Sequence, residues 1–160
     1  PGLKMPEAKG SMIGFGDVHT RPHIYRAIIE GIGYALLEGV ERIERKSGHK
    51  VNRVMVSGGG SQSDAICQIT ADLFDRPVVR SETYETSGLG AAINGFVGIG
   101  VYATHEEAVE KMVHWDSTFL PRPEASHIYH ELYTRVYKRI YPSLQPLYRE
   151  IQRITGYPDI

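Results

Sequence analysis

Apolar side chains recur at spacings of three and four residues between Arg21 and Lys46, the period of a helix that buries one face. The apolar positions in this segment are Ile24, Ile28, Ile32, Leu36, Val40 and Ile43. Thr20 is a candidate N-cap, and the segment KSGHK ends the pattern with basic residues and a glycine. Three glycines inside the segment each cost about 1 kcal/mol relative to alanine, so close approach of another backbone should offset them. We therefore expect a long helix packed on more than one side.

A strand, a helix and a second strand are predicted next. Val51–Val56 is a β-branched run whose last three residues are all apolar, as in an interior strand covered on both faces. A helical pattern follows in SQSDAICQITADLF, and the segment RPVVRS, centred on Val78, then reads as a short strand. The connection is long enough for parallel pairing, so we expect a right-handed βαβ unit.

The remaining patterns are mainly helical. The glycine- and alanine-rich segment TSGLGAAINGFVGIG, which begins at Thr86, predicts a helix whose small-residue face lets a neighbour approach closely, and THEEAVEKMV predicts a short helix. A long helical region spans 124–155, with tyrosines at four-residue spacing that favour packing over ligand stacking. Pro142 and Pro146 should bend or split it. A further short strand is possible at GSMIGFG, near the start.

Composition narrows the class of protein. A chain of 160 residues with 41% hydrophobic and 23% charged side chains suits one globular domain, residues 1–160. A net charge of -1, with the two signs scattered, disfavours nucleic acid and anionic membranes as partners. Cys67 is the only cysteine, and no apolar run is long enough to span a bilayer, so we expect a soluble, cytoplasmic protein. The chain begins at Pro1 with a polar loop, which suggests a piece of a longer protein.

Three consecutive glycines, Gly58, Gly59 and Gly60, separate the first strand from its helix in the stretch SGGGSQSD. Such a junction brings unobstructed backbone N–H groups and the positive end of a helix dipole to one point, which attracts phosphate or another part of a nucleotide. A tight β-to-α turn explains the glycines equally well. From these residues alone the two interpretations are about even.

Other familiar site motifs are missing. A P-loop needs a lysine where this chain has Ser63 and Asp64, and GLGAAI lacks the third glycine of a dinucleotide fingerprint. HTRPH and HIYH have no carboxylate or cysteine at ligand spacing, and no G-x-S-x-G elbow supports a nucleophilic serine. We expect Ser61 to cap the helix.

Taken in order, the segments HTRPHIYRAIIEGIGYALLEGVE, VSGGGSQSDAICQITADLFDRPVV, ETSGLGAAINGFVGIGVY and EEAVEKMV resemble the C-terminal domain of the FGGY family of carbohydrate kinases. The resemblance covers nearly the whole chain and is strongest to xylulokinase-like members, which share a G-G-G-x-x-S turn, a helix ending Q..AD and an E....GAA helix. The glycerol kinase branch is a poorer match at Gly60 and Ser63. The resemblance implies an α/β fold, the C-terminal half of an RNase H-like, actin-like ATPase, with a short, mainly parallel sheet covered by helices.

The family's chemistry implies ATP and Mg²⁺ as cofactors and a small carbohydrate, most closely a ketopentose such as xylulose, as acceptor. Carried over by position, Gly59, Gly60 and Ser63 match the residues that contact ATP or ADP, with Gly58 and Ser61 flanking them. Only glycine lets a backbone lie flat against a ligand.

The family's sugar-binding residues, catalytic aspartate and phosphate loops precede the segment seen here, so we expect no catalytic residue in this chain and negligible kinase activity from it alone. Strands that the family places before this segment are also absent, which predicts an exposed apolar edge and self-association, with a homodimer as one form.

Two other functions stay open. One is a non-catalytic, actin-like module that binds a nucleotide or a partner. The other is a dinucleotide-dependent oxidoreductase, because Glu82 and Glu85 lie near the spacing at which such enzymes place an acidic residue.

Overall fold

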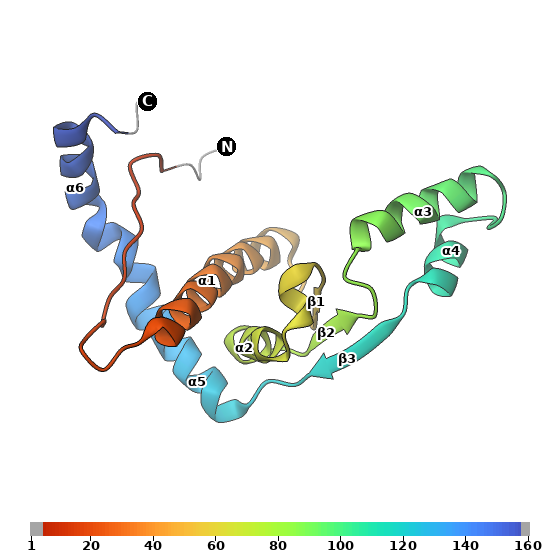
Figure 1. Ribbon diagram of the computed structural model, residues 1–160, viewed down its shortest axis with the longest axis horizontal. Helices are drawn as coiled ribbons and strands as arrows, with labels where there is room; N and C mark the ends of the chain where they lie inside the picture. Colours follow the sequence, from red (N-terminus) through yellow and green to blue (C-terminus); the bar gives the residue numbers. More distant parts are fainter. Residues whose placement is uncertain (1–4, 158–160) are drawn as a thin grey trace.

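A small sheet lies between two groups of helices in the protein, whose computed structural model describes residues 5–157 (Figure 1). In chain order the elements are α1 (Arg21–Ser47), β1 (Val54–Val56), the 3₁₀ turn η1 (Gly59–Gln62), α2 (Asp64–Phe74), β2 (Val78–Ser81), α3 (Thr86–Gly98), α4 (His105–Met112), β3 (Trp115–Phe119), α5 (Pro123–Leu132), the π-helical segment η2 (Tyr133–Tyr137) and α6 (Lys138–Thr155). Pro1, where the chain begins, lies outside the described residues. The described helices include none that is long and apolar enough to cross a membrane.

The sheet has three strands in the order β1-β2-β3. The parallel pair expected around the glycines is confirmed, since Val54 of β1 pairs with Val78 of β2 and α2 connects them. β3 was not expected, because its sequence WDSTF is mostly polar, and it pairs antiparallel to β2 with Phe119 opposite Val78. The expectation of a mainly parallel sheet therefore holds for one of its two strand pairs, and the sheet is mixed.

β1 is an edge strand in the described chain, which corrects the expectation of an interior strand covered on both faces. The side chain of Met55 remains 49% exposed. Val78, on the central strand, is fully buried together with Cys67 and Ala71 of α2. One face of the sheet is thus covered by α2, while the outer edge of β1 has no partner strand among residues 5–157.

The predicted long helix is confirmed as α1, with Thr20 as its N-cap and Gly48 in a left-handed conformation (φ 72°) at its end. Its buried face overlaps with the expected stripe only at Val40. Tyr34 is the buried residue of α1, and Leu37 and Val40 pack beside it against α2 and η2. The exposed large side chains of the expected stripe are Ile28, Ile32, Leu36 and Ile43, at 53–61% exposure. They are exposed because the described residues place no element against that side.

Close backbone approach explains only one of the three glycines in α1. A Cβ on Gly33 would lie 2.8 Å from Cδ1 of Leu73. The close approach of α2 to α1 therefore requires that residue 33 has no side chain. Gly31 and Gly39 would meet nothing within 4 Å. α1 does pack against both α2 and the tyrosines of α5 and η2, but close backbone approach does not account for Gly31 and Gly39.

Tyrosines dominate the core between α1 and the C-terminal helices. Tyr133 is 1% exposed and stacks on Tyr34 with ring centroids 5.7 Å apart, and Tyr137 lies 5.1 Å from the same ring. The packing role expected for the tyrosine stripe is confirmed. The helical region is interrupted by the π-helical η2 at these tyrosines, whereas Pro142 and Pro146 both lie inside α6 and do not split it.

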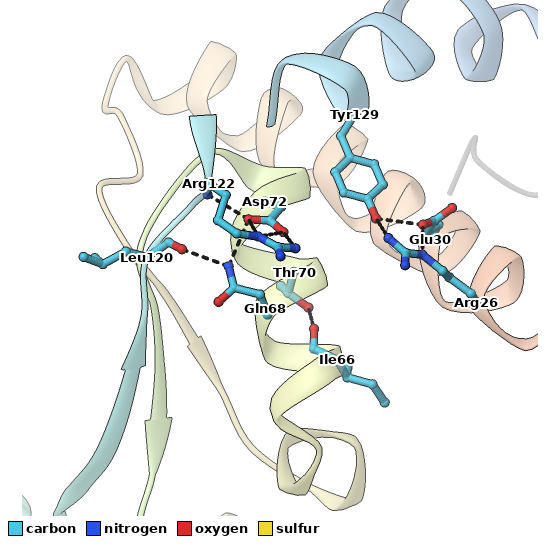
Figure 2. A network of polar contacts seen from close by, with 9 residues as sticks. All are labelled: Arg26, Glu30, Ile66, Gln68, Thr70, Asp72, Leu120, Arg122 and Tyr129. Atoms are coloured by element: carbon cyan, nitrogen blue, oxygen red, sulfur yellow. Dashed lines mark hydrogen bonds and ion pairs between the residues drawn. The ribbon is translucent and has the colours of Figure 1, made fainter. Parts of the chain in front are cut away.

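A buried carboxylate links α2 to the start of α5 (Figure 2). Asp72 is fully buried and accepts hydrogen bonds from the backbone N–H (2.8 Å) and guanidinium of Arg122 and from Nε2 of Gln68 (2.9 Å). Burial alone would raise the pKa of Asp72, but these hydrogen bonds and the positive charge of Arg122 outweigh burial and hold the pKa below its usual value. The carboxylate therefore stays ionised and fixes the N-terminus of α5 against α2.

A second network fastens α5 to α1 (Figure 2). The hydroxyl of Tyr129 donates to Oε1 of Glu30 at 2.7 Å and accepts from Arg26 at 3.0 Å, while Nε of Arg26 donates to the same Glu30 oxygen. Each of the three polar groups is thus hydrogen-bonded to the other two.

α3 and α4 form a pair set apart from the other helices, connected to them through the ends of β2 and β3 (Figure 1). The helix expected from Thr86 is confirmed as α3, but its small-residue face meets no close neighbour. A Cβ on Gly88, Gly90, Gly95 or Gly98 would find nothing within 4 Å. The segment GSMIGFG is irregular and not a strand, because no described strand lies beside it.

Candidate functional site

The chain leaves β1 at Val56 and turns through the glycines before α2 begins. Gly58 has φ 85° and ψ −178°, a conformation that is essentially restricted to glycine. Its carbonyl accepts hydrogen bonds from the backbone N–H (3.1 Å) and the Oγ (2.7 Å) of Ser61. Gly58 therefore sets the direction in which the rest of the turn projects.

Gly59 and Gly60 form the exposed part of the turn. A Cβ added to either would meet no atom within 4 Å. In the described part of the chain their backbone N–H groups have no hydrogen-bond partner, as is usual at the start of a helical turn. The turn thus offers a flat, open backbone surface with two free donors, a surface that suits close contact with a ligand.

The structure separates the roles of the two serines of the turn, and Ser61 does not have the capping role expected of it. Ser61 is buried within η1 and does not cap α2. Ser63 is the N-cap, and its Oγ accepts the backbone N–H of Ile66 at 3.4 Å. Since Ser63 is only half-buried and Ser61 donates inward to Gly58, Ser63 is the serine with a hydroxyl near the surface.

The segment after β2 lies beside the glycine turn. The backbone N–H of Gly58 donates to the carbonyl of Tyr84 at 3.1 Å, and Oγ1 of Thr86 donates to Oγ of Ser57 at 3.0 Å. A hollow of about 630 Å³ adjoins this junction, and its lining includes Tyr84 and the N-terminal part of α3. The turn is therefore joined to a segment that lines this hollow, although residues 57–63 do not line it themselves.

Cys67 lies beneath the turn and is nearly inaccessible to solvent. Burial raises the pKa of its thiol, so the group is protonated near neutral pH and its Sγ donates to the carbonyl of Ser61 at 3.3 Å. A buried, protonated thiol is a poor nucleophile. Cys67 supports the turn structurally.

The structure brings the five sequence-predicted positions, Gly58, Gly59, Gly60, Ser61 and Ser63, together in one turn. Sequence reasoning missed the neighbours that hold this turn in place, namely Cys67, Arg80, Tyr84 and Thr86. Only Arg80 carried a signal, because a charged side chain in an otherwise apolar strand usually has a partner. Among residues 5–157 there is no group of three or more His, Cys, Asp or Glu side chains placed to hold a metal ion.

Known proteins are similar to this chain in sequence. Residues 3–99 match the model of the FGGY family of carbohydrate kinases, C-terminal domain. The xylulose kinase of Staphylococcus epidermidis is 35% identical over 149 residues, which are 93% of this chain and 28% of that protein. The glycerol kinase of Pseudothermotoga lettingae is 36% identical over 115 residues, 72% of this chain and 23% of that protein. The chain therefore spans less than a third of the length of these relatives.

Similarity extends to three dimensions. The crystal structure of xylulose kinase from Rhodospirillum rubrum superposes with a TM-score of 0.75 at 30% identity, covering 91% of this chain and 29% of that one. The expected fold class, an actin-like ATPase domain, is thereby confirmed. Family membership also leaves the oxidoreductase interpretation without support. With its family model matched over more than half its length, this chain belongs to the FGGY family of carbohydrate kinases, to whose C-terminal domain it corresponds.

Proposed function

We propose that the full-length protein transfers the γ-phosphate of ATP to a hydroxyl of a small carbohydrate, and that the glycine turn of this chain contacts the nucleotide. Family membership supports the kinase activity. The observation that carries the assignment of the turn is the open space over Gly59 and Gly60, where no atom of the chain lies within 4 Å of an added Cβ. Such a surface accepts a nucleotide directly against the backbone, with Gly58 fixing the turn and Ser63 presenting its hydroxyl beside it.

A ketopentose such as xylulose is the proposed acceptor. Relatives described as xylulose kinases support it, while the match to a glycerol kinase shows that similarity over this region extends to relatives of different specificity. We attribute the choice of carbohydrate to residues outside this chain.

Catalysis of phosphoryl transfer consists mainly of positioning the reactants and neutralising charge. Mg²⁺ supplies the charge neutralisation when it is bound to the nucleotide phosphates. We propose that Mg²⁺ enters with ATP, since this ion characteristically keeps several waters and binds substrate phosphates. The part assigned to this chain is to orient the nucleotide, with Gly59 and Gly60 excluding any side chain from the contact. The remaining groups, including the base that activates the acceptor hydroxyl, would come from the rest of the polypeptide.

The proposal is tested with the purified full-length protein, ATP, Mg²⁺ and a panel of xylulose, ribulose and glycerol, by measuring ADP release. We expect ATP-dependent turnover that is fastest with a ketopentose, and displacement of a bound fluorescent ATP analogue by ATP but not by NAD. Nucleotide binding without turnover on any carbohydrate would favour the non-catalytic module instead. Absence of both binding and turnover would contradict both functions.

A further inference from the structure

Arg80 connects the glycine turn to the two strands behind it. Its side chain is 17% exposed and leaves β2 beneath η1 and the start of α2. On one side, Nη1 of Arg80 donates to the carbonyl of Ser61 at 3.2 Å and to Oδ1 of Asp64 at 2.7 Å. On the other side, β3 supplies two acceptors, Asp116 and Ser117.

The contacts to β3 are equally short. Nε and Nη2 of Arg80 donate to Oδ2 of Asp116 at 2.9 and 2.7 Å, and Nη2 also donates to Oγ of Ser117 at 3.0 Å. Ser117 in turn donates to the same Asp116 oxygen at 2.7 Å, and the ring of Phe119 lies 5.4 Å from the guanidinium carbon. The contacts to β3 thus fix the orientation in which the guanidinium meets the turn.

All the hydrogen-bond donors of Arg80 are engaged. A guanidinium has five N–H donors in a rigid fork, and the structure gives each one an acceptor. A lysine ammonium has three donors on a flexible stem and cannot span both sides of this arrangement. The position therefore requires arginine for its geometry and not only for its charge.

The end of this chain of contacts is the carbonyl of Ser61, inside the turn. That oxygen also accepts the thiol of Cys67, and the Ser61 hydroxyl bonds back to Gly58. Ser61 is therefore held from beneath by Arg80 and Cys67 and within the turn by Gly58, while the N–H groups of Gly59 and Gly60 stay free on the outer surface. The turn is fixed without any contact that would obstruct its exposed face.

We propose that Arg80 is a positioning residue for the nucleotide turn, which it holds in its binding conformation by joining the Ser61 carbonyl to Asp116 on β3. The inference rests on the proposed function, since it assumes that the turn contacts ATP. Arg80 itself touches the turn from behind and not the ligand. Asp116 acts through Arg80, with no contact of its own to the turn.

The test is the Arg80→Lys variant of the full-length protein, compared with Arg135→Lys, which alters an ion pair of similar length to Glu131 away from the turn. R80K is expected to raise KM for ATP by about tenfold, because hydrogen bonds to a charged group are lost at the turn. KM for the carbohydrate should stay within about twofold of wild type, as should both constants in R135K. A purely structural role would affect both substrates alike.

Asp116→Ala supplies a second variant at a half-exposed position, where misfolding is a smaller risk. It should raise KM for ATP in the same direction by a smaller factor, and the double variant R80K/D116A should match R80K alone, because both changes break one connection. An additive double variant, or an R80K protein whose KM for ATP equals wild type, would overturn the inference. A wild-type protein that neither binds nor hydrolyses ATP would instead overturn the proposed function.

Discussion

Replacing Gly60 with leucine in the full-length protein is expected to lower kcat/KM for ATP by at least about 100-fold, equivalent to about 2.7 kcal/mol of binding to the transition state. The reason is steric, because a side chain at this position projects from the outer surface of the turn into the space assigned to the nucleotide. KM for the carbohydrate should be little changed. The measurement is steady-state ADP release with each substrate varied in turn.

The loss in the Gly60→Leu variant can be assigned to the ligand because the chain itself has room for the new side chain. No atom lies within 4 Å of the added Cβ, so the variant should fold and unfold as wild type does. Gly98→Leu, at the end of α3 and equally free of neighbours, is the matched control and should retain wild-type kinetics. If G60L kept the wild-type kcat/KM for ATP, the nucleotide could not lie against this turn.

Asp72→Asn is expected to destabilise the 160-residue chain by about 2 kcal/mol, because the ionised carboxylate that accepts from Gln68 and Arg122 is lost inside the protein. The amide that replaces it presents an NH₂ group to these donors. Arg122, 62% exposed, can reach water, which keeps the effect below that of a fully buried pair. Urea unfolding followed by circular dichroism, at two protein concentrations to control for self-association, measures the difference.

The pH dependence of the Asp72→Asn effect has a definite sign. The pKa of Asp72 is lowered in the folded state, so its contribution is complete above the ordinary aspartate pKa of about 4 and is lost as the pH falls through the folded-state value. The difference between wild type and D72N should therefore shrink in acid. Glu131→Gln, at an exposed ion pair, should change stability by less than about 0.5 kcal/mol. Equal stability of D72N and wild type at neutral pH would contradict the role of Asp72.

Local patterns in the sequence were sufficient to predict the elements that depend on them. The period of three and four residues located α1, because that period is typical of a helix whichever of its faces is covered. The apolar runs around Val54 and Val78 located the parallel pair, in which Val78 is buried against α2. β3 escaped prediction because an edge strand such as WDSTF has little to bury and is defined mainly by its pairing with β2. Its pairing partner is more than 30 positions away in the sequence and leaves no local signal.

The buried face of α1 was predicted only in part, for a related reason. Its isoleucine stripe and its Tyr34 face are both apolar. Hydrophobicity alone does not indicate which of these two faces α2 and the C-terminal helices will cover. At the site, glycine spacing identified the turn, since a backbone at φ 85° requires glycine at Gly58. The supports of the turn were hidden because Arg80 and Cys67 meet Ser61 only after the sheet has formed.

The contacts that fasten α1 to α5 also bear on how the chain folds as it is made. Arg26, Glu30 and Tyr34 bond to Tyr129, which lies 95–103 positions later in the sequence. At typical rates of synthesis the ribosome needs about 5 to 20 seconds to add that many residues. During this interval α1 lacks its tyrosine partners and its exposed isoleucines are open to other chains, whereas α2 follows soon after and can cover part of the Tyr34 face. Contacts of such long range also slow folding once synthesis is complete, so the exposed apolar side of α1 is a segment on which a chaperone has time to act.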